Sequence, residues 1–158
     1  MDPSSFTRRA AEALEAARSE ATTRSHASVT PEHLMLGVLA DQDGLAYPLL
    51  GRLSVDPVSL RNRMVEAIDR LPRVHGGAEA QIDRGTIAVL EAADAERKRI
   101  KDDYLSIEHL LLALAAAKSS AGEALRSVGA DRESMLAALA DLRGPHRVTS
   151  ANPEATME

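Results

Sequence analysis

Two adjacent pairs of a carboxylate and an imidazole are the residues of this chain whose types and spacing could do chemistry. They are Glu32 with His33 and Glu108 with His109. Carboxylate oxygens and imidazole nitrogens are common metal ligands. However, adjacent helical residues point about 100° apart, and neither histidine has a second histidine one turn away. The spacing therefore disfavours a metal site, and we expect both histidines to be partly buried and satisfied by a helix cap or by water.

The two glutamates have uses of their own. Each stands in the first turn of a predicted helix, where a negative charge stabilises the helix dipole by about 0.3 to 1 kcal/mol. That structural role would be enough to explain them. A carboxylate fixed at a rigid helix start can also receive a cation, such as the guanidinium of a bound protein, through paired hydrogen bonds. Both interpretations stay open for Glu32 and Glu108.

Both pairs lie in a stretch that occurs twice. Residues 30–40 read TPEHLMLGVLA and residues 106–116 read SIEHLLLALAA. Each copy opens with a hydroxyl residue suited to an N-cap and is then apolar almost all round, so we expect each to be the buried axis of its repeat. A second match, ALEAA at 13–17 with VLEAA at 89–93, has the same offset of 76 (89 minus 13, as 109 minus 33).

The duplication predicts an all-α fold of about eight helices, four in each of two units related by a pseudo-two-fold axis. Apolar residues at spacings of three and four define the helices, and turns with Gly, Pro or Asp separate them. One domain covers 1–142, with repeat one at 6–72, a linker at 73–81 and repeat two at 82–142. Residues 143–158 contain Pro and Gly and are predicted to be a flexible linker toward a further module.

Composition narrows the class of function. Aromatic residues make up 2% of the chain and the net charge is -5, which argues against a nucleic-acid binder that needs a basic face and stacking platforms. No apolar run reaches the roughly 18 residues of a membrane span, and the chain does not open like a signal peptide. Cysteine is absent, which suits a reducing compartment. We expect a cytoplasmic protein that binds neither nucleic acid nor membranes.

The motifs of common enzymes are missing from the sequence. It contains no G-x-x-x-x-G-K-[ST] nucleotide loop, no H-E-x-x-H zinc motif and no G-x-S-x-G nucleophile turn. We therefore predict that this segment is not an enzyme and uses no cofactor of its own.

The duplicated unit with its two Glu-His helix starts resembles the N-terminal domain of the Clp unfoldases, over residues 6–142. Within that family, DRLPRV at 69–74, RVTS at 147–150 and PEAT at 153–156 resemble the ClpB disaggregases more than ClpC. The resemblance implies a stress-response chaperone: a mobile domain on a homohexameric AAA+ ring that weakly binds exposed apolar segments of unfolded or aggregated clients. ATP, Mg²⁺ and a coiled coil would belong to the full-length protein.

The resemblance also implies site residues. Functional positions of ClpB-like domains fall on Thr7, Asp102 and Glu108, which would position the domain or contact clients. On the structural alternative, Thr7 is an N-cap and Asp102 is a solvated loop charge. Surplus apolar residues should mark a client groove, and Ile87 and Leu90 widen the apolar stripe of one helix in the second unit. They are candidate client-binding residues, or they pack between the units.

Two alternative functions stay open. ClpC-type domains bind adaptors, and use this glutamate with the threonine that opens each unit to recognise phosphorylated arginine. Thr7 precedes Glu32 by 25 residues (32 minus 7), but Asp83 stands 25 residues before Glu108 (108 minus 25) and its charge should repel a phosphate. The sequence thus predicts at most one phosphoarginine or cation site, at Thr7 and Glu32. The other alternative is a stand-alone regulatory or scaffold protein without an ATPase in the same chain.

Overall fold

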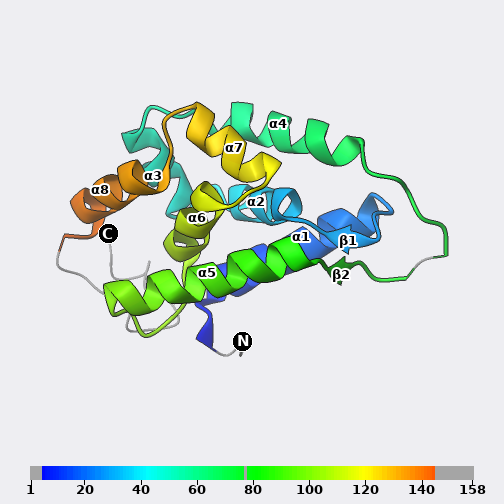
Figure 1. Cartoon of the computed structure of the whole chain (residues 1–158), viewed down its shortest axis with the longest axis horizontal. Helices are drawn as coiled ribbons and strands as arrows, with labels where there is room; N and C mark the ends of the chain where they lie inside the picture. Colours follow the sequence, from blue (N-terminus) through cyan, green and yellow to red (C-terminus); the bar gives the residue numbers. More distant parts are fainter. Residues whose placement is uncertain (1–4, 77, 145–158) are drawn as a thin grey trace.

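The computed structural model of the chain describes residues 5–76 and 78–144, and eight helices lie in these ranges (Figure 1). The first unit holds α1 (Arg8–Thr23), β1 (Ser28–Val29), α2 (Pro31–Ala40), α3 (Ala46–Arg52) and α4 (Pro57–Asp69). The second unit holds β2 (Gln81–Ile82), α5 (Arg84–Ile100), α6 (Ile107–Ala116), α7 (Ser120–Ser127) and α8 (Arg132–Arg143). The predicted helical fold with four helices per unit is confirmed.

The interior of the molecule is formed by α2 and α6. Residues 107–115 of α6 are all buried, and in α2 all residues are buried except Glu32 and Ala40. Figure 1 shows the two helices in the middle of the fold, with α1 and α5 along one side and α4 and α7 along the other. The prediction that the two Glu-His stretches are buried axes is therefore confirmed.

Short parallel strand pairings join the two units. The strands β1 and β2 pair with Val29 opposite Ile82, and an isolated bridge places Phe6 opposite Leu105. These are the same contact on the two sides of the pseudo-two-fold axis, because Ile82 follows Phe6 by 76 and Leu105 follows Val29 by 76. Each unit's first helix thus starts beside the axis helix of the other unit. The sequence did not predict these strands, because two residues give no alternation to detect.

The first helix of unit one packs very closely on its axis helix. A Cβ atom on Gly37 of α2 would lie 2.1 Å from the carbonyl oxygen of Ala13 in α1, so only glycine permits this approach. The matching residues in unit two are Ala113 and Val89, 76 positions further on. Both side chains are larger than those of Gly37 and Ala13, and they keep α5 from approaching α6 as closely as α1 approaches α2.

The last helix ends one residue later than predicted. Arg143, which the sequence assigned to the linker, is the last residue of α8 and is buried. Residues 145–158, the rest of the predicted linker, lie outside the described residues. None of the described helices is both long and apolar enough to cross a membrane.

Candidate functional site

The starts of α2 and α6 are built in the same way around a histidine. The backbone N–H of Thr30 donates to Nδ1 of His33 at 2.9 Å, and that of Ser106 donates to Nδ1 of His109 at 2.9 Å. Since a backbone N–H can only donate, each Nδ1 is an acceptor and each Nε2 carries the proton. Both histidines are buried and each completes a capping box, which confirms that a helix cap satisfies them. Across the described residues, no three His, Asp or Glu side chains gather as a metal site would require.

In the first unit, the Nε2–H of His33 donates a hydrogen bond to another histidine. Nε2 of His33 lies 2.9 Å from Nδ1 of His26, and the two rings meet edge to face. Burial and the neighbouring His26 lower the pKa of His33 from 6.5 to about 4. Burial also lowers the pKa of His26, with a further contribution from Arg24. The interior of this unit is therefore neutral at pH 7.

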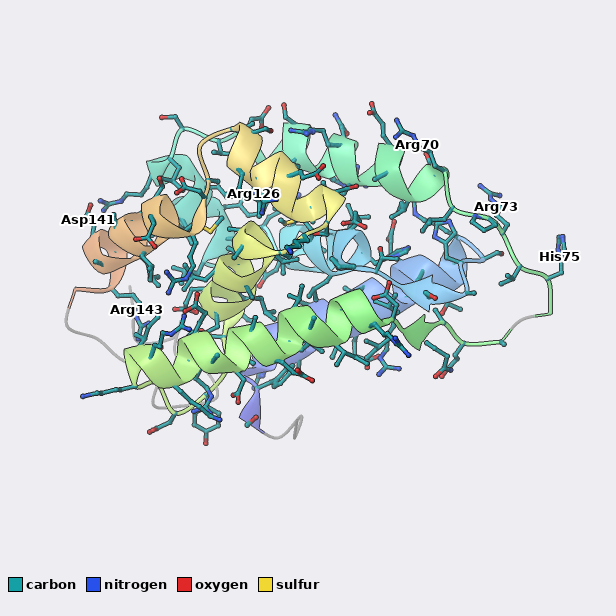
Figure 2. All side chains as sticks on the ribbon, viewed as in Figure 1. Arg70, Arg73, His75, Arg126, Asp141 and Arg143 are labelled. Carbon is teal, nitrogen blue, oxygen red and sulfur yellow. The ribbon has the colours of Figure 1, made fainter. Side chains whose placement is uncertain are left out.

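In the second unit, a charged residue takes the place of His26. Asp102 stands 76 positions after it, and its Oδ2 accepts a hydrogen bond from His109 Nε2 at 2.7 Å. Arg143 donates to both oxygens of the same carboxylate, at 2.8 and 2.5 Å. Asp102 is 2% exposed and Arg143 is 4% exposed. Figure 2 shows Arg143 turned inward from the end of α8, while Arg73 and His75 point outward from the stretch that connects the units.

Glu108 completes this cluster. Its carboxylate accepts a hydrogen bond from Ser106 Oγ and lies 4.0 Å from Nη1 of Arg143. Burial opposes the charge of Arg143, but its hydrogen bond to Asp102 and the charges of Glu108 and Asp102 outweigh burial and raise the pKa of Arg143. We call Asp102, Glu108, His109 and Arg143 the buried cluster. It fixes the end of α8 against the loop that joins α5 to α6.

The buried cluster corrects one interpretation of the sequence. Asp102 as a solvated loop charge is wrong, because the side chain is enclosed and paired with Arg143 and His109. Contact of Asp102 or Glu108 with a client stays a prediction, and at 2% exposure neither residue can touch one unless the cluster opens. Sequence reasoning missed Arg143, because it assigned this residue to the linker after the last helix, and no residue near Arg143 in the chain indicates its partner Asp102.

Thr7 lies beside the second unit and not beside Glu32. It is the N-cap of α1, and its backbone N–H donates at 2.8 Å to the carbonyl of Leu105, three residues before Glu108. The corresponding place beside the first unit's axis helix is held by Asp83, whose N–H donates at 3.2 Å to the carbonyl of Val29. The strand exchange between the units explains this arrangement.

Glu32 is also engaged across the units. Its Oε2 accepts a hydrogen bond at 2.9 Å from the backbone N–H of Ala121, in the first turn of α7. None of the hydrogen bonds found among the described residues joins Glu32 to Thr7. The phosphoarginine site predicted at these two residues stays a prediction, and in this structure its two halves belong to different environments.

An apolar groove of about 350 Å³ lies between α5 and the end of α6. The helical part of its lining consists of small or aliphatic residues of α5 and α6, with the first residue of α2: Gly85, Ala88, Val89, Ala92, Ala113, Ala116 and Pro31. The turn from α6 to α7 forms the end wall with Ala117, Lys118 and Ser119. Such a surface can bury a large apolar side chain of a partner, because it offers space and its polar side chains, Lys118 and Ser119, lie only in the end wall.

An ion pair fills the matching position of the first unit. Arg9 matches Gly85 and Asp41 matches Ala117, each with the offset of 76. Nη1 of Arg9 lies 2.5 Å from Oδ2 of Asp41. Together with the close approach at Gly37, this pair covers the position where the second unit is open. The groove therefore follows from small residues that replace a charged pair.

The two apolar residues chosen from the sequence do not line this groove. Leu90 is 9% exposed and belongs to the hydrophobic core. Ile87 is 45% exposed but points away from the side of α5 that carries Gly85 and Ala92, since successive helical residues turn by about 100°. The usable signal was the spacing of Gly85, Ala88 and Ala92 at three and four, which marks a shallow face and not a large apolar one.

These observations define a class of protein: an all-helical domain of two fused four-helix repeats, with a peptide-sized apolar groove beside the second axis helix. Residues 5–143 match the family described as the Clp repeat (R) N-terminal domain. The chain belongs to this family, and the predicted resemblance is confirmed.

Individual relatives of the chain are chaperones named ClpB. The chain is 33% identical over 159 residues to the chaperone protein ClpB of Mycobacterium tuberculosis, an alignment that covers 100% of this chain and 19% of the relative. It is 35% identical over 162 residues to ClpB of Bacillus cereus, again covering 100% and 19%. The chain thus spans about a fifth of the length of these relatives, and it is their N-terminal region that it resembles.

Solved structures share the fold. The Hsp104 N-terminal domain from Candida albicans has a TM-score of 0.80 at 20% identity, over 92% of this chain and 96% of that chain. A complex of the ClpV N-domain with a VipB peptide has a TM-score of 0.69 at 19% identity, over 87% and 86%.

Proposed function

We propose that this chain is the client-binding N-terminal domain of a ClpB-like, ATP-dependent protein disaggregase of the cytoplasm. The observation that carries the proposal is the apolar groove of the second unit. A groove lined by alanine and glycine accepts many side chains without demanding a particular sequence, which is what binding of unfolded clients needs. A fold of the same kind, the ClpV N-domain, has been solved with a VipB peptide, and this supports a peptide-binding role.

Binding should be weak and driven by apolar burial. Each large aliphatic side chain that enters the groove contributes about 1.5 to 3 kcal/mol. One or two such anchors, after the loss of peptide freedom, give a dissociation constant of about a millimolar or somewhat below. Weak binding allows the domain to release a client to the ATPase modules of the proposed full-length protein.

The remaining parts of this function lie outside the chain. ATP hydrolysis, with ATP and Mg²⁺, would take place in a further module of a homohexameric protein, since the sequence has no nucleotide-binding loop. Unfolded or aggregated proteins are the proposed partners, together with adaptor proteins. A Walker motif in the coding sequence soon after Glu158 would support this assignment, and a stop codon there would favour the stand-alone alternative.

The test is an NMR titration of the chain with short peptides from an unfolded client. We expect chemical-shift changes at Ala88, Ala92 and Ala116, which line the groove, that saturate at about millimolar peptide. The absence of any shift at that concentration would refute client binding. Shifts confined to the first unit would place the site elsewhere.

The phosphoarginine alternative has a separate test. A peptide carrying phosphorylated arginine should lose its binding in the Glu32→Ala variant if Glu32 receives the guanidinium. The engagement of Glu32 by Ala121 does not favour this outcome, because a ligand would have to replace an existing hydrogen bond.

A further inference from the structure

The groove carries one charge. Of its ten lining residues, nine are apolar or uncharged and the tenth is Lys118. Lys118 is exposed in the turn between α6 and α7. Among the carboxylates of the described residues, none forms an ion pair with its ammonium group. The lysine is therefore available to a bound molecule.

The hydrogen-bond acceptors of this region have partners other than Lys118. Glu32, whose carboxylate reaches this end of the molecule, accepts its hydrogen bond from Ala121, three residues after Lys118. The carbonyls of Ala115 and Ala117, at the negative end of the α6 dipole, both accept hydrogen bonds from Nη1 of Arg126, at 2.8 and 2.9 Å. Figure 2 shows Arg126 on α7. This end of the groove thus carries Lys118 and Arg126, while the carboxylate of Glu32 is held by the backbone N–H of Ala121.

The first unit differs in charge as well as in shape. There Arg9 and Asp41 form an ion pair at the position that matches Gly85 and Ala117. The residue that matches Lys118 is Gln42, which is uncharged. An open apolar groove with an unpaired cation at its end is a property of the second unit.

We propose that the groove selects client segments in which an acidic side chain flanks a bulky aliphatic anchor. The anchor enters between Ala88, Ala92 and Ala116, and the carboxylate pairs with Lys118. This inference rests on the proposed client-binding function of the groove and names the kind of segment that it prefers. Because the pair is exposed, its effect on affinity should be modest, up to about fivefold, and sensitive to salt.

Overall charge cannot produce the same preference. The chain has a net charge of -5, which by itself favours basic peptides over acidic ones. A preference for acidic flanks must therefore come from a local cation. Tighter binding of the acidic peptide would therefore indicate the local cation, and tighter binding of the basic peptide would indicate the overall charge.

The experiment uses three peptides with the same leucine-containing core, flanked by two aspartates, two serines or two lysines. Each is titrated by NMR into the whole chain, into Lys118→Glu and into Arg61→Glu. Arg61 is exposed on α4 and does not line the groove, so Arg61→Glu changes the net charge equally and serves as the control. We expect the aspartate-flanked peptide to bind up to about fivefold more tightly than the lysine-flanked one in the wild type and in the control. The order should reverse in Lys118→Glu, and the preference should shrink at about 1 M salt.

Two results would overturn the proposal. One is equal binding of the three peptides in the wild type, and the other is an unchanged order in Lys118→Glu. If groove residues still shift in either case, client binding itself stands and only its selectivity is refuted. If none of the peptides binds, the proposed function fails together with this inference.

Discussion

The two units share the same arrangement of four helices, but they differ in the packing of the first helix, in the partner of the buried histidine and in the side chains at the groove position. In the first unit, the axis helix carries Gly37 against α1, its buried histidine meets another histidine, and an ion pair fills the position of the groove. In the second unit, bulkier residues hold α5 away, the histidine donates to Asp102, which is paired with Arg143, and small residues leave the groove open. The first unit has an ion pair at this position and a neutral histidine pair in its interior. The second unit has an open groove and a charged cluster in its interior. The second copy therefore combines a binding surface with a buried charged cluster, whereas the first copy is filled at the position of the groove.

The largest expected effect comes from the buried cluster. Asp102→Ala removes the carboxylate to which the buried Arg143 donates two hydrogen bonds, and breaking a buried ion pair in this way costs about 3 to 5 kcal/mol. The matching change in the first unit, His26→Ala, removes a neutral hydrogen bond and should cost about 1 to 2 kcal/mol. Urea unfolding followed by circular dichroism measures both. Equal losses would show that the charged cluster is no more important than the histidine pair.

The second effect is a pH dependence that belongs to the first unit. His33 stays neutral in the folded protein down to about pH 4, whereas in the unfolded chain it is protonated below about 6.5. As the pH falls from 6.5 to 4, the unfolded state binds a proton that the folded state refuses. The free energy of unfolding should therefore decrease over this window, by up to about 3 kcal/mol, and this contribution levels off below pH 4.

A pair of variants isolates this contribution. His33→Gln keeps a side chain that completes a capping box and removes the titrating group, so the loss of stability between pH 6.5 and 4 should become smaller. His75→Gln, at an exposed position in the connecting stretch, should keep the wild-type profile. Unfolding curves at a series of pH values give the comparison. If both variants follow the wild type, another group causes the pH dependence.

A smaller effect concerns the close approach of α1 and α2. Gly37→Ala places a Cβ atom where only 2.1 Å separates it from Ala13, and the two helices must move apart at a cost of about 1 to 3 kcal/mol. The reverse change in the other unit, Ala113→Gly, introduces no clash and should cost about 1 kcal/mol through helix propensity. Thermal unfolding of the two variants measures the difference. A neutral Gly37→Ala would mean that the first unit is not packed as tightly as described.

The smallest effect is that of the contact between the units at Glu32. Glu32→Ala leaves the N–H of Ala121 without its acceptor and should cost about 1 kcal/mol. It should also weaken peptide binding a few-fold, because the turn that carries Lys118 loses a support. Glu32→Gln keeps an acceptor oxygen and should behave nearly like the wild type in both measurements. If Glu32→Gln binds peptide as poorly as Glu32→Ala, the glutamate acts through its charge and not as a positioning residue.

Much of the fold was predictable from the sequence because its signals are local. The eight helices follow from apolar spacing, and the duplication follows from two matches at one offset. The burial of α2 and α6 follows from their apolar residues on every side. Even the role of the two histidines was predictable, since a helix start needs its N–H groups satisfied.

The remaining features depend on contacts that leave no local pattern. Asp102 and Arg143 are 41 residues apart, and neither residue's neighbours in the chain indicate the other. The strand exchange that takes Thr7 away from Glu32 rests on pairings only two residues long. The groove arises from side-chain volume that is missing at Gly85 and Ala117, whereas apolar surplus predicts large residues such as Ile87.

The measurement that bears most directly on the role of the second unit is peptide binding to the double variant Gly85→Arg/Ala117→Asp. This variant recreates the Arg9–Asp41 pair of the first unit within the groove. Gly85 has only ordinary contacts around its Cβ position and Ala117 is a helix C-cap, as Asp41 is, so the fold should be kept. Gly51→Arg, at an open position on α3, is the control. We expect the double variant to lose at least about tenfold in affinity for an apolar client peptide, with stability unchanged and the control binding like the wild type. A dissociation constant that stays the same when the groove is filled would show that clients bind elsewhere.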